Sequence, residues 1–134
     1  MCLMAGIPTL SSMLSGYAGT ACAAGEEQKP RCFIASDGEV DDQNSLCRLL
    51  LYANEIEILG IIYCLTGGGA YEAWARDRIN AYGQIRSNLM VHADGWPEAA
   101  HLLSITKPEN TGMARTVVET LLDDDPRPTC VAAD

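Results

Sequence analysis

Short apolar runs alternate with segments of helical periodicity along most of this chain. Apolar runs at 31–36, 56–63 and 129–133 predict buried strands. Between them, apolar residues recur at three- and four-residue spacing, as Leu46, Leu49, Leu50 and Ala53 do in one segment. The predicted helices are 41–54, 71–86, 98–104 and 111–122. Because right-handed β-α-β crossovers join parallel strands, the pattern predicts an α/β fold, a Rossmann-like parallel sheet with flanking helices.

Three aspartates follow the first predicted strand. Asp37 comes directly after it, Gly38 allows the backbone to turn, and Asp41 and Asp42 begin the next helix. The carboxyl ends of strands are where α/β sheets bind ligands. Carboxylates this close together repel one another unless a cation is present, so the cluster favours an oxygen-seeking metal such as Ca²⁺ or Mg²⁺. The alternative is helix capping by Asp41 or Asp42, which leaves Asp37 unexplained.

The string Ser-Asp-Gly-Glu-Val-Asp-Asp at 36–42 resembles the N-terminal signature of the inosine/uridine-preferring nucleoside hydrolases. It is more similar still to the nucleoside-hydrolase-like domain of a family of cellulose-binding proteins, in which a later helix closes on Asp-Asp-Pro-Arg-Pro. This chain has that second string at 124–128, and the segments 51–55 and 92–97 also fit in order and spacing. The resemblance covers the chain from about Lys29 to the C-terminus.

The resemblance implies a role for each aspartate. Asp37 would be both a calcium ligand and the group that orients and deprotonates the attacking water. Asp42 would be a bidentate calcium ligand, and Asp41 would hydrogen-bond the ribose hydroxyls. These residue types suit cleavage of an N-glycosidic bond, because carboxylates stabilise an oxocarbenium-like sugar and a bound cation lowers the pKa of water.

Two departures from the family pattern are informative. Many members carry another aspartate two residues before the first ligand, where this chain has Ala35. The same alanine argues against a haloacid-dehalogenase-type phosphatase, whose nucleophilic aspartate would fall there. The loop 64–69 lacks polar substrate-contacting residues, and its glycines lack the Gly-Lys-Ser/Thr ending of a phosphate loop.

The calcium site is expected to be incomplete within these residues. Calcium takes about six to eight oxygen ligands, and the family draws further ligands from later in the chain. We therefore expect 29–134 to be the N-terminal portion of a nucleoside-hydrolase-like domain, apparently truncated. Further β-α units and another aspartate are expected downstream of Asp134. The chain alone is expected to bind Ca²⁺ weakly and to show no measurable nucleoside hydrolysis.

The first 28 residues differ in composition from the rest. They contain no Lys, Arg or Asp until Lys29, and Ala21-Cys22-Ala23 is an acceptable cleavage site. We interpret 1–28 as a signal peptide or a disordered N-terminus, which favours a secreted or extracytoplasmic protein. The segment is too short and polar to span a membrane. A net charge of −9 without a basic cluster argues against nucleic acid as a partner, so none is expected.

Cleavage there would leave Cys32, Cys47, Cys64 and Cys130, whose spacing does not match a zinc site. Secretion would permit disulfides, but this pattern does not demand them.

Aromatic and histidine side chains offer further candidates. Trp74 fits a core position, whereas Trp96, in a predicted loop, is the better candidate for stacking on a sugar or base. His92 and His101 lie outside the matched motifs and are interpreted as surface or loop-packing residues.

Three hypotheses for function follow. The first is calcium-dependent hydrolysis of an N-glycosidic or related sugar bond. The second is a carbohydrate-binding protein without catalysis, and the third is an inactive fragment. The expected partner is a small-molecule nucleoside or carbohydrate, with no membrane, and the sequence leaves the oligomeric state open.

Overall fold

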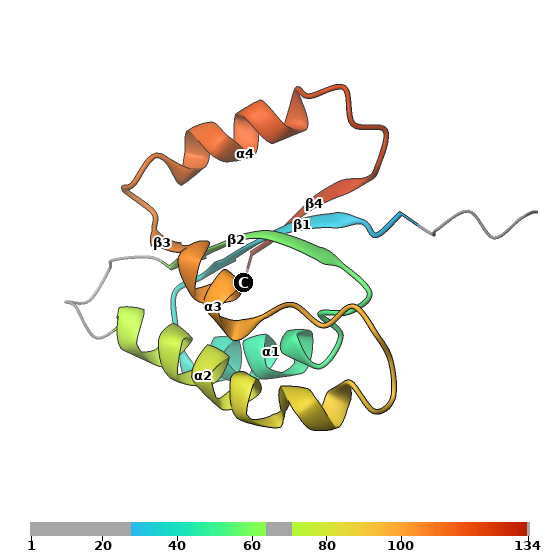
Figure 1. Cartoon of the computed structure of the whole chain (residues 1–134). Helices are drawn as coiled ribbons and strands as arrows, with labels where there is room; N and C mark the ends of the chain where they lie inside the picture. Colours follow the sequence, from blue (N-terminus) through green and yellow to red (C-terminus); the bar gives the residue numbers. More distant parts are fainter. Residues whose placement is uncertain (1–27, 64–70, 134) are drawn as a thin grey trace, which may run out of the picture.

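The computed structural model describes residues 28–63 and 71–133 and shows a parallel sheet with helices on both faces (Figure 1). All three pairs of neighbouring strands are parallel, and the order across the sheet is β3-β2-β1-β4. The predicted α/β fold is therefore confirmed. In chain order the elements are β1 (Arg31–Ser36), α1 (Val40–Leu50), β2 (Glu57–Tyr63), α2 (Tyr71–Leu89), α3 (Ala99–Ser104), β3 (Thr106–Pro108), α4 (Met113–Leu121) and β4 (Thr129–Ala133).

The predicted boundaries differ from the observed ones mainly at helix ends. Helix α1 ends at Leu50 rather than at residue 54, because the chain turns through residues 51–55. Ala53 nevertheless packs in the core, with only 1% of its surface exposed. The apolar period therefore predicted which side chains are buried better than it predicted where the helix stops.

Strand β3 was missed by the sequence pattern. It is three residues long and contains Lys107 and Pro108, so it has no apolar run to detect. Residues 106–108 form a strand because they pair with β2, where Thr106 aligns with Ile61 and Lys107 with Ile62. The described sheet consequently has four strands, rather than the three expected.

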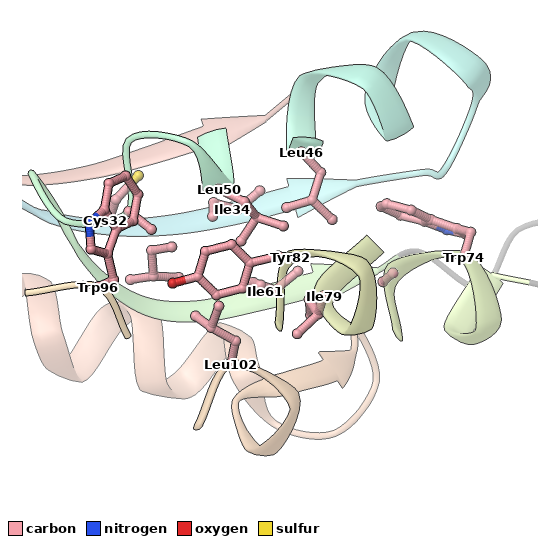
Figure 2. Packing of buried hydrophobic residues seen from close by; sticks show 13 residues of the cluster. Cys32, Ile34, Leu46, Leu50, Ile61, Trp74, Ile79, Tyr82, Trp96 and Leu102 are labelled. Carbon is pink, nitrogen blue, oxygen red and sulfur yellow. The ribbon is translucent and has the colours of Figure 1, made fainter. Parts of the chain in front are cut away.

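Helices α1, α2 and α3 lie on one face of the sheet and α4 on the other (Figure 1). The main core fills the space between the three helices and the sheet (Figure 2). It includes Ile34 and Ile61 from the strands, Leu50 from α1 and Ile79 from α2. Burying large apolar side chains of this kind stabilises the fold by about 1.5–3 kcal/mol each.

On the face covered by α4, the close approach of helix and sheet depends on a glycine. A Cβ atom placed on Gly60 would lie 2.5 Å from Cε of Met113 and 3.0 Å from the Phe33 ring. Phe33 is completely buried. An alanine at position 60 would therefore require the flexible Met113 side chain to move and would crowd the buried Phe33 ring.

The strand order puts a change of direction between β1 and β4. From β1 the chain moves through β2 to β3 along one side, then crosses the sheet through α4 and returns as β4 on the other side of β1. Open α/β sheets bind ligands beside such a switch point, at the carboxyl ends of the strands. The segment that follows β1 is therefore the first place to look for a site.

The N-terminal segment interpreted as a signal peptide lies almost wholly outside the described residues. Among the residues that the structure describes, no helix is long and apolar enough to cross a membrane.

Candidate functional site

The segment Ser36–Asp42, here called the aspartate loop, connects the end of β1 to the first turn of α1. Its backbone turns at Gly38, which has a φ of 85°. This left-handed conformation is strained for residues with a side chain. The predicted turn at Gly38 is therefore confirmed.

Asp42 is the buried centre of the aspartate loop, with 5% of its surface exposed. Its Oδ2 accepts three hydrogen bonds: from Ser36 Oγ at 2.6 Å, from the Asp37 amide at 2.8 Å and from the Gly38 amide at 3.1 Å. Burial alone would raise the pKa of Asp42. The hydrogen bonds outweigh burial and hold that pKa below its ordinary value, so the carboxylate is ionised at neutral pH.

These hydrogen bonds argue against the alternative in which Asp42 caps helix α1. The N-cap of α1 is Glu39, whose side chain makes no capping hydrogen bond. Asp42 instead accepts from amides that precede the helix, at positions 37 and 38. Its described bonds fix the turn between strand and helix and do not satisfy the free amides of the first helical turn.

Asp37 and Asp41 differ in surroundings. Asp37 is half-buried; its Oδ1 accepts a hydrogen bond from the Glu39 amide at 3.0 Å, and its side chain also interacts with that of Asp42. Asp41 is exposed in the first turn of α1. The structure thus brings Asp37 and Asp42 together, with Asp41 beside them at the surface.

A chain of hydrogen bonds from α2 also supports the loop. Gln43 Nε2 donates to the Gly38 carbonyl at 3.0 Å, and Arg78 donates to Gln43 Oε1 at 2.9 Å. Arg78 therefore acts on the loop through Gln43. Sequence reasoning missed both residues and Ser36, because their partners come from the folded arrangement; Gln43, directly after the aspartate pair, was the one local signal.

The donor set of the aspartate loop fits calcium in kind. Asp37 and Asp42 offer hard carboxylate oxygens, and Asp42 is held in a fixed orientation. Within residues 28–63 and 71–133, no three side chains of His, Cys, Asp or Glu gather as a metal centre. The loop therefore offers carboxylate oxygens of the kind that calcium binds, and the convergence of Asp37 and Asp42 on one cation stays a prediction.

A pocket of about 170 Å³ lies on the core side of Asp42. Its lining is apolar apart from Ser36, Asp42 and Ser45, and it includes Trp74. A sugar needs several hydrogen-bonding partners, so its hydroxyls are better served on the outer side of the loop, where Asp37 and Asp41 lie.

The interpretation of Trp96 as a stacking residue is wrong. Trp96 is 8% exposed and packs in the core, at the end of the cluster opposite Trp74 (Figure 2). Trp74 is equally buried, as predicted, and it is the tryptophan beside the aspartate loop. His92 and His101 are both exposed, in agreement with a surface position.

The second motif, Asp124–Pro128, lies at the amino end of the sheet, away from the aspartate loop. There Arg31 pairs with Asp123 through two hydrogen bonds of 2.6 and 3.0 Å, and Arg127 pairs with both Asp125 and Glu57. Asp123 and Asp125 are therefore both ion-paired, although Asp123 is exposed. Their hydrogen bonds to the arginines lower the pKa of both carboxyl groups. The second motif therefore has a structural role. Its ion pairs join the start of β1 and the start of β2 to the segment before β4.

The remaining evidence on this chain comes from known proteins to which it is similar. No curated protein matches the chain. One solved structure is similar with a TM-score of 0.63 and 29% identity, a nucleoside hydrolase-related hypothetical protein from Saccharophagus degradans that is associated with carbohydrate metabolism. The match covers 77% of this chain and 29% of that one, so the chain spans less than a third of its relative.

The family model described as "Cellulose-binding Sde182, nucleoside hydrolase-like domain" matches residues 31–127, from the start of β1 to one residue before the end of the second motif. The match contains the whole first string on which the resemblance was based and all of the second except Pro128. This chain therefore belongs to the cellulose-binding, nucleoside-hydrolase-like family.

Proposed function

We propose that the aspartate loop takes part in calcium-dependent hydrolysis of an N-glycosidic bond in a nucleoside or a related sugar. The observation that carries the proposal is the Asp42 carboxylate, which is buried, ionised and held by neutral donors at the carboxyl end of β1. A negative charge fixed by neutral groups keeps its attraction for a cation. An ion pair with a lysine or arginine would have cancelled that attraction.

Asp37 and Asp42 would hold the calcium ion, together with ligands from outside the described residues. When bound, the ion supplies positive charge that lowers the pKa of water at the site. The hydrogen bonds of Ser36 and of the two loop amides keep Asp42 in one rotamer, so the metal would not have to order it.

Asp37 would orient the attacking water and take its proton. Its Oδ1 accepts a hydrogen bond from the Glu39 amide, which helps to fix the orientation of the carboxylate. Asp41, exposed one turn further along, would accept hydrogen bonds from sugar hydroxyls. The negative charge of the loop would also stabilise the positive sugar that forms as the bond breaks.

Carbohydrate binding without hydrolysis is the second candidate. The family's description as cellulose-binding favours it, as does Ala35 at a position where many nucleoside hydrolases carry another aspartate. Binding of this polymer would also mean that the protein acts outside the cell. In this case Asp41 and Asp42 would serve recognition, and no water would be activated.

One set of assays separates the two candidates. The 134-residue chain alone is expected to show no hydrolysis, so the protein tested is this chain extended by the expected downstream β-α units. It is incubated with a chromogenic riboside in Ca²⁺ or in chelator, and its retention on cellulose is measured in the same buffers. Hydrolysis predicts calcium-dependent release of the chromophore, reduced at least about 100-fold by Asp37→Asn. Asp77→Asn, an exposed change on α2, is the matched control and should keep the wild-type rate.

Retention on cellulose without release of the chromophore would exclude the first candidate and support the second. Absence of both activities in the folded, extended protein would contradict both candidates.

A further inference from the structure

We propose that Cys32 and Cys130 form a redox-sensitive disulfide that fastens the edge strand β4 to β1. The two residues are 98 positions apart in the chain but are aligned partners on neighbouring parallel strands. This cross-link is independent of the proposed glycosidase function.

The backbone geometry meets the requirements of a disulfide. Neighbouring strands lie about 4.7–4.9 Å apart, within the Cα separation of about 4.4–6.8 Å that disulfides span. Aligned residues on adjacent strands direct their side chains to the same face of the sheet. Cys32 and Cys130 therefore face the same way, toward the side that carries α1, α2 and α3.

The side chains are already in contact. The two Sγ atoms are 2.8 Å apart, closer than unbonded sulfur atoms normally approach. Both thiols are free in the described structure, so only oxidation separates this arrangement from a covalent bond. Cys47, on α1, is also free and exposed, and it serves below as the control cysteine.

Burial sets the order of the chemical steps. Cys130 is exposed on β4, whereas Cys32 is 4% exposed inside the core. Burial, followed by the neighbouring Cys130 thiol, raises the pKa of Cys32 to about 12. An oxidant from solution therefore meets Cys130 first, and Cys32 completes the bond.

A small disulfide such as oxidised glutathione is the oxidant we propose. The Cys130 thiolate attacks one of its sulfurs, which forms a mixed disulfide and releases one glutathione thiolate that takes up a proton. Cys32, losing its proton, then attacks Sγ of Cys130 and releases the second glutathione. Two protein thiols lose two electrons and two protons, and one disulfide reagent becomes two thiols.

The bond would matter because β4 is the last described strand at its edge of the sheet. Cys130 and Val131 on this strand are exposed. Closing so long a loop stabilises the folded state mainly by restricting the unfolded chain. Oxidation would therefore strengthen attachment of the edge strand that borders the aspartate loop.

Peptide mapping of the full chain tests the proposal. The reduced protein is equilibrated with oxidised glutathione, alkylated and digested with trypsin and a glutamate-specific protease. Cleavage after Arg31, Glu39 and Arg48 separates Cys32 from Cys47, and cleavage after Glu119 isolates the peptide with Cys130. The expected product is peptide 32–39 joined to peptide 120–134 in most molecules. Glutathione retained on Cys130, or Cys130 joined to any other cysteine, would overturn the proposal.

Thermal unfolding gives a second readout. Oxidation should raise Tm by roughly 10 °C in the wild type and in Cys47→Ser. The rise should vanish in Cys130→Ser, where an exposed residue is changed and the reduced fold should be retained. A rise that persists in Cys130→Ser would refute the cross-link.

Discussion

Charged side chains at the two ends of the sheet have different kinds of partner. At the amino end, Arg31 and Arg127 pair with three carboxylates, Asp123 and Asp125 from the segment before β4 and Glu57 from β2. At the carboxyl end, Asp42 is held by a hydroxyl and two backbone amides, all of them neutral. Both ends carry family motifs, but only the second keeps a fixed negative charge in reach of a ligand. The ion-paired second motif thus maintains the fold, whereas the aspartate loop, whose Asp42 has neutral partners, is the candidate site.

The largest effect on stability is expected from Asp42→Ala. The change removes the acceptor for Ser36 Oγ and two loop amides, and buried donors left without a partner are costly. We expect the free energy of unfolding to fall by about 3 kcal/mol. Urea unfolding of the variant, beside Asp41→Ala as an exposed control, measures it. Equal stability of the two variants would mean that the Asp42 hydrogen bonds do not hold the turn.

A smaller loss is expected from Gly38→Ala. The φ of 85° is left-handed, and a Cβ atom there should cost about 1–2 kcal/mol. The substitution should also displace the amide that Asp42 accepts, so Ca²⁺ should bind more weakly. Gly83→Ala cannot serve as the control, since its Cβ would lie 2.9 Å from Ala99. Gly112→Ala shares the positive φ but has open space and lies far from the loop in sequence. It should lose similar stability and keep its affinity for calcium.

The smallest effect is expected at the Asp125–Arg127 ion pair of the amino end, whose side chains are 27% and 24% exposed and therefore partly screened by solvent. The pKa of Asp125 is lowered, chiefly by its hydrogen bonds to Arg127, from an ordinary value of 3.8. A lowered folded-state pKa contributes stability that is present above 3.8 and is lost as the pH falls below it. Asp125→Asn should therefore flatten the loss of stability below about pH 4. Chemical unfolding at several pH values measures this slope, and an unchanged slope would contradict the assignment.

The sequence predicted the fold well where apolar runs are long. Strands β1 and β4 were predicted with their observed bounds, and the parallel arrangement followed from the alternation of elements. Strand β3 could not be predicted, because a three-residue strand with Lys107 and Pro108 exists only through its pairing with β2. The end of α1 was missed because Ala53 continues the apolar period after the helix has stopped.

At the site, the sequence indicated which residues gather but not how they are held. The three aspartates and Gly38 follow from the motif itself. Support by Arg78 through Gln43 joins residues 35 positions apart, which no local pattern encodes. The burial of Trp96 was missed for the same reason: its segment is irregular, yet the loop folds back onto the core, where Arg86 donates to the carbonyl oxygen of Trp96 at 2.8 Å.

The calcium affinity of variants at the two ends of the sheet tests the central claim most directly. Isothermal titration with Ca²⁺ compares the wild type with Asp37→Asn at the carboxyl end and Asp125→Asn at the amino end. We predict weak but measurable binding by the wild type and by Asp125→Asn, and a loss of at least about tenfold in Asp37→Asn, equal to about 1.4 kcal/mol. Binding that is unchanged by Asp37→Asn, or that is lost on Asp125→Asn with the fold intact, would contradict the assignment of the metal to the aspartate loop.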